Sequence, residues 1–308
     1  MKHKSPLVSV IIPSYNHADL LPRAVHSACA QTYKHIEILI VDDASTDNTP
    51  AVGAMLEKED SRIRYIRKEE NGGVNAARNT GIRASIGEYI ALLDSDDEWL
   101  PTKLQEQMNV FFKSATPQLG LVYCKYENIC VSNEKTYSEK LPVPKGDMIQ
   151  NLLVYNIVLG GGSGAVIKKE CLDVVGFFDE NRTLKIGEDH EMWLRIATHY
   201  EFDYIKNTGF KYYIHENSAT RKTAQNVFIA SQDYIFQKHR TLYETYPSAY
   251  TKALVRYALR LVLYKQPRRA MHTMVQAFKM RPCVAFFAVP THTFSFASKI
   301  IRKKIHGC

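Results

Sequence analysis

The chain has 308 residues, of which 45% are hydrophobic and 23% charged, and this composition excludes a disordered protein. Its six cysteines form no CxxC pair and lack the spacing of zinc ligands, which is typical of a reduced cytoplasmic protein. The net charge of +8 is uneven, because residues 240–308 hold 13 lysines and arginines against a single acid, Glu244. A basic terminal segment indicates a polyanionic partner, either a membrane surface or a nucleic acid.

The first hundred residues alternate between strand and helix patterns. Repeated units of a short, fully apolar strand and a helix predict an α/β fold, with a mostly parallel central sheet covered by helices on both faces. The predicted strands are residues 8–12, 36–41, 63–66 and 89–93, and the predicted helices are residues 20–30, 50–56, 74–84 and 101–112.

The second part of the chain has a looser pattern. We expect an exposed hairpin or loop at residues 132–145 and a helical chain from about residue 218 onward. This division predicts an α/β domain over residues 1–220, followed by a helical, basic region over residues 221–308. The other predicted elements are strands at 121–123, 165–167 and 210–214 and helices at 147–154 and 188–197.

Polar segments follow each of the first four predicted strands. They are Ser14–Asn16, Asp42–Asp47, Asn71–Gly73 and Asp94–Asp97, in chain order. Ligands of open α/β sheets bind at the carboxyl ends of the strands. The sequence therefore predicts a ligand site where these four loops meet.

The acidic segment after the fourth strand is the central feature of that edge. Asp94, Asp96 and Asp97 would repel one another unless a cation lies among them, and carboxylates suit Mg²⁺ or Mn²⁺ when substrate phosphates complete the shell. The alternative interpretation is a solvated acidic turn that caps the next helix.

Other polar residues allow a functional and a structural interpretation. Asp42 and Asp43 can accept hydrogen bonds from a base or ribose, or simply form a turn. Arg78 lies one turn inside the helix after Asn71–Gly73, where it can approach a diphosphate. No GxGxxG follows the first strand, which argues against a dinucleotide-binding oxidoreductase.

Later segments of the chain supply further candidates. Glu188 and Asp189 open a helix, where they serve either as caps or, for one of them, as a general base. His215 is either an ordinary loop histidine or, if its strand returns to the acidic cluster, a metal ligand. The run Gly160–Gly164 forms either a flexible loop or a surface against which a sugar can lie.

Taken together, these motifs resemble a known family. The chain resembles the inverting family 2 glycosyltransferases of the GT-A fold, of the bacterial surface-polysaccharide type, over roughly residues 7–220. The motifs that carry the resemblance are Val8–Asn16, Val41–Thr49, Asn71–Gly73 with Ala77–Asn79, Leu93–Asp97, Gly176–Asp179 and Gly187–Arg195.

The resemblance implies roles for the residues of the nucleotide site. Pro13, Tyr15 and Asp43 would hold the nucleotide base, and Arg78 would lie in the nucleotide pocket. Asp94 would reach the ribose or the metal.

The resemblance also implies the catalytic apparatus. Asp96 would bind a divalent cation, Mn²⁺ or Mg²⁺, that bridges the diphosphate, and His215 would complete the metal shell. Asp189 would be the general base that takes a proton from the acceptor hydroxyl. The implied reaction is inverting transfer of a sugar from a nucleotide-diphosphate donor, with a UDP-sugar favoured, and forms no covalent sugar–enzyme intermediate.

The implied acceptor is a hydroxyl of a glycan or of a lipid-linked oligosaccharide in cell-surface polysaccharide synthesis. The basic C-terminal region fits such an acceptor, because its aromatic residues Phe286, Phe287, Phe294 and Phe296 lie between basic clusters, as in an interfacial anchor on anionic lipid. The alternative is a helical subdomain that packs on the catalytic part.

The sequence also predicts where the protein acts. Residues 1–6 are basic but lack the apolar segment of a signal peptide, and the longest apolar stretch, residues 283–297, is interrupted by Pro290 and His292. We therefore expect a cytoplasmic protein that lies on the inner face of the cytoplasmic membrane.

Two other functions would each account for part of the sequence. A nucleic-acid-binding module would use the basic tail but leave the acidic loops unexplained, so no nucleic-acid partner is predicted. A phosphotransferase of the haloacid dehalogenase type also carries a DxD motif, usually near the chain start. Here Asp94 follows three earlier strand–helix units and is followed by Asp97, Glu98 and Trp99, and both features argue against this type of phosphotransferase.

Overall fold

The first half of the sheet is parallel. The computed structural model describes residues 5–133, 135–138, 144–158, 161–215 and 224–293. Strand β1 lies between β2 and β4, β3 lies outside β2, and all three pairings are parallel. Every residue of β1 and β2 is buried, because helices cover both faces of the sheet, and this explains their continuous apolar sequences. The four strands are β1 (Val8–Ser14), β2 (Ile36–Asp42), β3 (Ile63–Arg67) and β4 (Tyr89–Leu92).

Alternate residues of these strands face two separate hydrophobic clusters. Ile11 and Leu39 belong to the cluster formed with one set of helices, whereas Val10 and Ile38 belong to the cluster formed with the other set. The first set is α3 (Val74–Ala84), α6 (Lys169–Val175) and α7 (Glu188–Ala197), and the second set is α1 (Leu21–Cys29), α2 (Thr49–Glu59) and α4 (Lys103–Lys113).

The second half of the sheet is mixed. Its strands are β5 (Glu98–Trp99), β6 (Leu119–Cys130), β7 (Lys135–Ser138), β8 (Val166–Lys168) and β9 (Glu201–Ile214). The order across the sheet is β3-β2-β1-β4-β8-β6-β9-β5, and β7 pairs with β6 at its side. Strand β8 is antiparallel to β4 and β6, while β6 and β9 are parallel. The predicted hairpin is present as β6 and β7, although residues 139–143 lie outside the described part.

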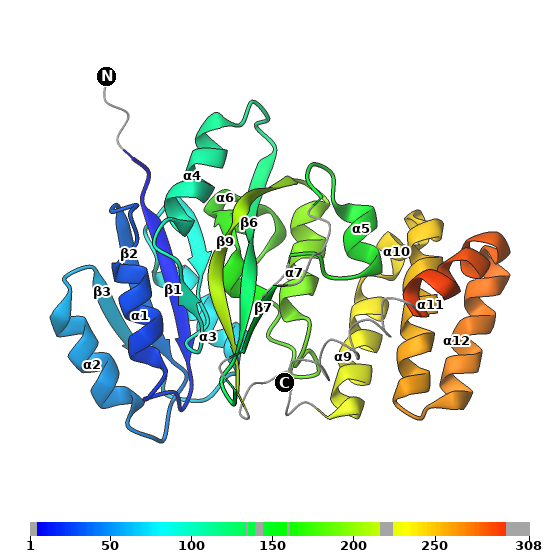
Figure 1. Cartoon of the computed structure of the whole chain (residues 1–308), viewed down its shortest axis with the longest axis horizontal. Coiled ribbons are helices and arrows are strands. Elements are labelled where there is room, and N and C mark those ends of the chain that lie inside the picture. The colour runs from blue at the N-terminus through cyan, green and yellow to red at the C-terminus, as the bar shows by residue number, and fades with distance from the viewer. Residues whose placement is uncertain (1–4, 134, 139–143, 159–160, 216–223, 294–308) are drawn as a thin grey trace.

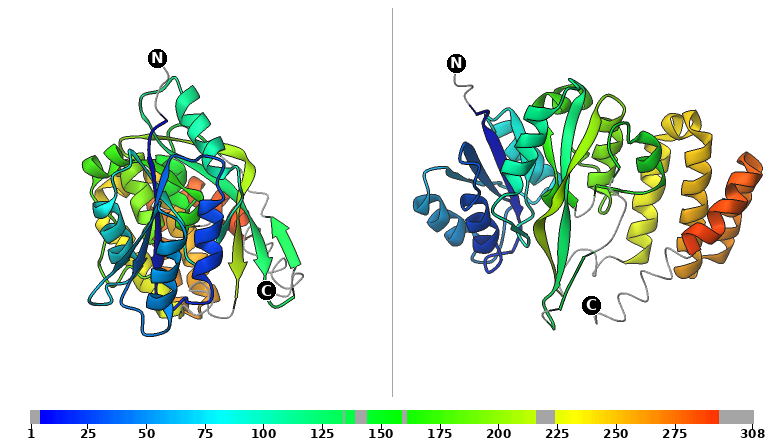
Figure 2. Two further views of the ribbon diagram at one scale, coloured as in Figure 1. Left: turned by 90° about the vertical axis from the view of Figure 1, so that its left-hand side faces the viewer. Right: turned by 45° about the horizontal axis from the view of Figure 1, so that its top comes forward.

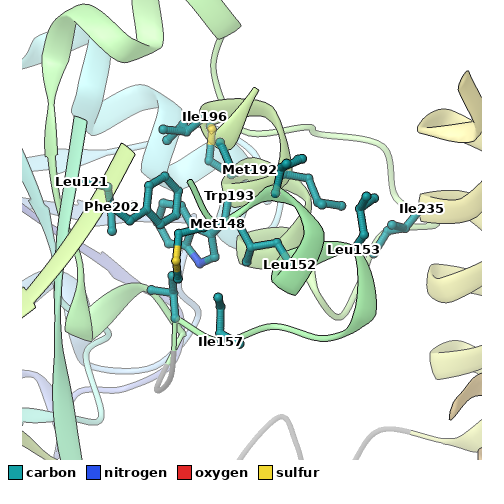
Figure 3. Close-up of a cluster of buried hydrophobic side chains, with 14 of the residues drawn as sticks. Leu121, Met148, Leu152, Leu153, Ile157, Met192, Trp193, Ile196, Phe202 and Ile235 are labelled. Carbon is teal, nitrogen blue, oxygen red and sulfur yellow. The ribbon is translucent and has the colours of Figure 1, made fainter. Parts of the chain in front are cut away.

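Helix α7 is the most deeply packed helix of the α/β part. It spans the predicted residues and packs against the short helix α5 (Ile149–Val154). Figure 3 shows Met192 and Trp193 of α7 beside Met148 and Leu152, with Leu153 next to Ile235 of the C-terminal region. Full burial of Trp193 removes a large apolar surface from water and fixes the position of α7.

The C-terminal region is helical, as predicted, within residues 224–293. Its helices are α9 (Gln225–Lys238), α10 (Arg240–Thr245), α11 (Pro247–Leu263) and α12 (Pro267–Met280), and residues 282–293 are also helical. These helices lie at the opposite end of the molecule from β3 and α2 (Figures 1 and 2). One hydrophobic cluster contains residues from both sides of residue 220, and the division into two domains there stays a prediction. None of the helices in the described ranges is long and apolar enough to cross a membrane.

A buried carboxylate joins α7 to this region. The fully buried carboxylate of Glu191 forms ion pairs with Arg195 of α7 (Nη2 to Oε2, 2.9 Å) and with Lys238 (Nζ to Oε1, 2.8 Å). His239 Nε2 lies 3.1 Å from the same carboxylate. Burial alone would raise the pKa of Glu191, but hydrogen bonds from His239 and Arg195 outweigh it and hold the pKa well below its usual range.

We expect Glu191→Gln to lower the free energy of unfolding by roughly 2–3 kcal/mol at neutral pH, because three basic side chains lose their shared anion. The pKa of Glu191 is depressed in the folded state, so its contribution is complete above the unfolded value of about 4.5 and is lost as the pH falls. Urea unfolding of wild type and variant should therefore differ most at neutral pH, and the difference should shrink below about pH 4.5.

The matched control is Glu244→Gln, which removes an exposed i,i+4 pair with Arg240 and should change stability little. Equal effects of the two substitutions would contradict a structural role for the Glu191 cluster.

Candidate active site

The loops after β2 and β3 are joined by a single carboxylate. Asp43 is buried, and it accepts hydrogen bonds from the backbone N–H of Gly72 at 3.0 Å and of Gly73 at 2.7 Å, as well as an ion pair from Lys68. Gly73 has φ +88°, a conformation that a residue with a side chain rarely adopts. The predicted base-binding carboxylate therefore also fixes the shape of the loop.

The two other residues predicted to hold the base lie on the neighbouring strand. Pro13 is buried near the end of β1, where it is paired with Val41 of β2. Tyr15 lies just beyond the strand and is 45% exposed, so its ring is accessible to a flat ligand. Pro13, Tyr15 and Asp43 thus lie at the carboxyl ends of the adjacent strands β1 and β2.

Arg78 is a buried, charged group at this edge. Its side chain is 2% exposed, and its Nη2 donates to Asp94 Oδ1 at 2.9 Å while its Nη1 donates to Glu188 Oε1 at 3.1 Å. Burial opposes the charge of Arg78, but Asp94 and Glu188 outweigh that effect and raise its pKa. Arg78 therefore joins α3, the loop after β4 and the start of α7.

The acidic loop after β4 divides into inward and outward carboxylates. Asp97 is fully buried, and Ser163 Oγ donates to its Oδ2 at 2.5 Å while accepting from the backbone N–H of Asp94 at 3.0 Å. Burial and the neighbouring charges of Asp96 and Asp94 raise the pKa of Asp97 well above its ordinary value. Asp97 therefore fixes the loop to the glycine-rich turn η1 (Gly161–Gly164).

Asp96 faces the end of β9. His215 Nε2 lies 3.2 Å from Asp96 Oδ2, so the late strand does return to the acidic loop, which is the condition under which the sequence favours a metal site. Burial opposes ionisation of Asp96, but the hydrogen bond from His215 and electrostatic interactions with His17 and His215 lower its pKa. Arg23 donates to the Asp96 carbonyl at 2.5 Å and stacks over the Tyr213 ring.

Asp189 begins α7 and is 8% exposed. Asn156 Nδ2 donates to its Oδ2 at 2.8 Å, and the His190 backbone N–H donates to its Oδ1 at 2.7 Å. Burial raises the pKa of Asp189, although these hydrogen bonds and the charge of Arg78 oppose the shift.

Asp94 and Asp189 face a common point. A side chain placed on Gly161 would put its Cβ 3.6 Å from Asp94 Oδ2 and 3.9 Å from Asp189 Oδ2. Gly161 therefore leaves open the space between two carboxylates that lie far apart in the sequence. Its φ of +59° also favours glycine.

The donor atoms at this edge suit a hard divalent cation. Asp96 and His215 offer a carboxylate oxygen and an imidazole nitrogen side by side, and Asp94 adds a second carboxylate on the same loop. Burial raises the pKa of Asp94, and the charge of Asp96 adds to that rise, so a cation here would relieve repulsion. No group of three candidate ligands is assembled within the described ranges.

Several residues of the site escape prediction from the sequence. Ser163 donates a hydrogen bond to Asp97, which is 66 positions away in the sequence, and Asn156 donates one to Asp189, which is 33 positions away. His17 Nδ1 lies 2.7 Å from Ser95 Oγ. Glu188 is named in the helix-start motif, but its pairing with Arg78 appears only in the structure. His17 directly follows the polar segment after the first strand, and Ser163 lies within the run Gly160–Gly164, whereas Asn156 has no sequence signal.

Comparison with known proteins identifies the family of the α/β part. Residues 9–176 match the family described as Glycosyl transferase family 2. The chain is 33% identical over 215 residues to WfgD of Escherichia coli, a UDP-Glc:alpha-D-GlcNAc-diphosphoundecaprenol beta-1,3-glucosyltransferase, covering 69% of this chain and 79% of WfgD. The chain spans 58%, 62% and 36% of the lengths of three Rickettsia relatives, each described as an uncharacterized glycosyltransferase.

Two solved structures share the fold at low sequence identity. TarS 1–349 of S. aureus, in complex with UDP-GlcNAc, aligns with a TM-score of 0.60 and 14% identity over 95% of this chain and 92% of its own. The mannosyltransferase PcManGT of Pyrobaculum calidifontis, in complex with GDP-Man and Mn²⁺, aligns with a TM-score of 0.54 and 18% identity over 98% and 81%. These alignments confirm the predicted GT-A-like α/β fold with C-terminal helices.

Proposed function

We propose that this chain, which belongs to glycosyl transferase family 2, transfers a sugar from a UDP-sugar to a hydroxyl of a lipid-linked glycan in cell-surface polysaccharide synthesis. The protein is a glycosyltransferase, and we infer its donor and acceptor from the residues of the site. The observation that carries it is the convergence of Asp94 and Asp189 on the space left open by Gly161. A donor and an acceptor must meet within reach of both a nucleotide site and a base.

The proposed donor site is the edge formed by the first four strands. Tyr15 offers an exposed ring and Asp43 a fixed carboxylate for the base, and Asp94 lies between them and the catalytic residues along the sheet edge. UDP is favoured as the nucleotide because WfgD uses UDP-Glc and the fold is shared with TarS, which binds UDP-GlcNAc.

Asp189 is the proposed general base. Its carboxylate is held by Asn156 and by the start of α7, so it faces the acceptor hydroxyl in one orientation. As the hydroxyl oxygen attacks the anomeric carbon, Asp189 takes its proton, and the nucleotide leaves from the opposite face. This single displacement inverts the anomeric configuration and requires no covalent sugar–enzyme intermediate.

Asp96 and His215 are the proposed protein ligands of Mn²⁺ or Mg²⁺. A bound divalent cation would supply positive charge to the leaving diphosphate. The arrangement of Asp96 and His215 supports this role, as does the Mn²⁺ present with GDP-Man in PcManGT.

The C-terminal helices are proposed to hold the enzyme on an anionic membrane surface. Phe286 and Phe287 are 65% and 72% exposed, and Met271 is 67% exposed. Basic residues lie among these apolar ones, in the pattern of an interfacial anchor. Phe294 and Phe296, which the sequence also predicts to belong to the anchor, lie outside the described residues.

The donor and metal sites are tested together by thermal unfolding. We expect UDP with Mn²⁺ to raise the melting temperature of the wild-type protein, because a ligand that binds the folded state and not the unfolded state stabilises the folded state. UDP with EDTA should raise the melting temperature less, because the metal is then removed. Asp96→Asn should remove the metal-dependent part of the shift. The exposed Asp173→Asn should retain the full shift. Shifts of equal size with Mn²⁺ and with EDTA in the wild-type protein would contradict the proposed ligands.

The role of Asp189 is tested by the pH dependence of kcat/KM. Asp189 must be ionised to act as a base, and its pKa is raised. We therefore expect kcat/KM to fall as the pH is lowered, along an acid limb with a midpoint above the usual pKa range of aspartate. Asn156→Ala removes a donor to the charged form and should move this limb to higher pH. Asn109→Ala, on the exposed side of α4, should leave it in place, and an unmoved limb in Asn156→Ala would argue against Asp189 as the base.

Membrane association is tested by co-sedimentation with vesicles that contain anionic lipid. The wild-type protein should bind, and binding should weaken with added salt. Replacing both Phe286 and Phe287 by serine should lower the bound fraction several-fold, because two exposed rings no longer insert. Phe112→Ser, which removes a 51% exposed ring of α4, is the control, and equal losses would refute a specific anchor.

A further inference from the structure

A pocket lies beside Asp189, the proposed base, on the side of the C-terminal helices. It encloses about 270 Å³ and is lined by the end of α5, the start of α7 and facing residues of α9 and α11. Asp189 and Asn156 line it, whereas Asp94, Asp96 and His215 are not among its described lining residues. The pocket is therefore distinct from the donor side of the site and shares only the region of the base with it.

Two arginines of α11 line this pocket. Arg256 and Arg260 lie four residues apart, so they project from the same face of the helix. The Arg256 guanidinium lies 5.4 Å from the centre of the Tyr155 ring, and the Arg260 guanidinium lies 4.7 Å from the centre of the Phe228 ring. The rings hold both guanidinium groups at the pocket wall.

The charges of the pocket favour an anionic occupant. Burial lowers the pKa of His190 to about 4, so this lining residue is neutral near pH 7. Asp189 is then the only acid among the described lining residues, against the two arginines. Burial and the positive charge of Arg260 lower the pKa of Arg256 to about 10, and an anion beside the two guanidinium groups would offset their repulsion.

We propose that this pocket is the acceptor subsite and that Arg256 and Arg260 bind a phosphate or diphosphate group of the acceptor. The planar guanidinium suits phosphate oxygens, and hydrogen bonds between charged partners are strong in a partly buried site. A phosphate held by α11 leaves the sugar of the acceptor to extend toward Asp189. This inference rests on the proposed transferase function and adds the chemical class of the acceptor.

The position of α11 also connects the subsite to the apolar surface. Val262 and Leu263, at the end of the same helix, are 58% and 48% exposed. A lipid-linked diphosphate could therefore place its charged group in the pocket and its chain along the exposed apolar residues. A phosphate within a polymeric acceptor would use the same arginines but not this surface.

The test is a calorimetric titration of the protein whose donor site is filled with UDP and Mg²⁺. Farnesyl diphosphate is the lipid-linked probe, inorganic pyrophosphate is the probe without a lipid, and farnesol is the probe without a charge. The variants are Arg256→Gln, Arg260→Gln and the double substitution. Lys252→Gln removes an exposed charge from the same helix and serves as the control.

We expect farnesyl diphosphate to bind the wild-type protein and the Lys252→Gln variant equally, and each arginine substitution to weaken binding by about tenfold or more. Binding of pyrophosphate that is equally strong and equally dependent on the arginines would identify a phosphate source without a lipid. Farnesyl diphosphate binding that the double substitution leaves unchanged, or that farnesol matches, would overturn the proposal.

Folding and donor binding are monitored separately by the UDP-induced rise in melting temperature. A variant that retains this rise is folded and has an intact donor site, so its loss of farnesyl diphosphate binding reports on the arginines. If the wild-type protein shows no UDP response, the proposed function fails. The titration without UDP then still decides whether the arginines bind phosphate.

Discussion

The ion pairs of Arg78 are the constraint on which the site depends. This buried guanidinium contacts Asp94 after β4 and Glu188 at the start of α7, which are separated by 94 positions in the sequence. Without a cation between them, two carboxylates in a buried region would repel each other and favour their protonated forms. Arg78 therefore allows an acidic site to exist inside the fold, and it fixes α7 against the sheet.

Helix α7 transmits this constraint to the rest of the molecule. Its first turn carries Glu188 and Asp189 toward the site, and Glu191, in the same turn, is paired with Lys238 and His239 of the C-terminal region. A shift of the C-terminal helices would thus act on the helix that bears the proposed base. The hydrophobic cluster that contains both Trp193 and Ile235 reinforces the same connection (Figure 3).

The sequence predicts the parts of the structure that local patterns determine. The four parallel strands, helix α7 and the meeting of polar loops at one sheet edge follow from apolar runs, helical spacing and the rule for strand ends. The 14-residue length of β9 does not follow, because its pairing with β6 includes register shifts that depend on tertiary contacts. Arg78 shows the limit most clearly: the sequence predicts its place near the nucleotide, whereas its burial between Asp94 and Glu188 depends on packing across α3 and α7.

The two arginine environments show how one residue type serves different purposes on either side of Asp189. Arg78 is enclosed by two carboxylates, so its charge is balanced within the fold, and the donor side as a whole remains rich in carboxylates. An incoming diphosphate would meet repulsion there, which is the physical reason why the proposed function requires a divalent cation at Asp96. Arg256 and Arg260 lie against aromatic rings in a pocket whose described lining residues include one acid, Asp189. In the proposed function, a phosphate on the acceptor side therefore requires no metal, and the two anionic substrates approach the base from surfaces that attract them by different means.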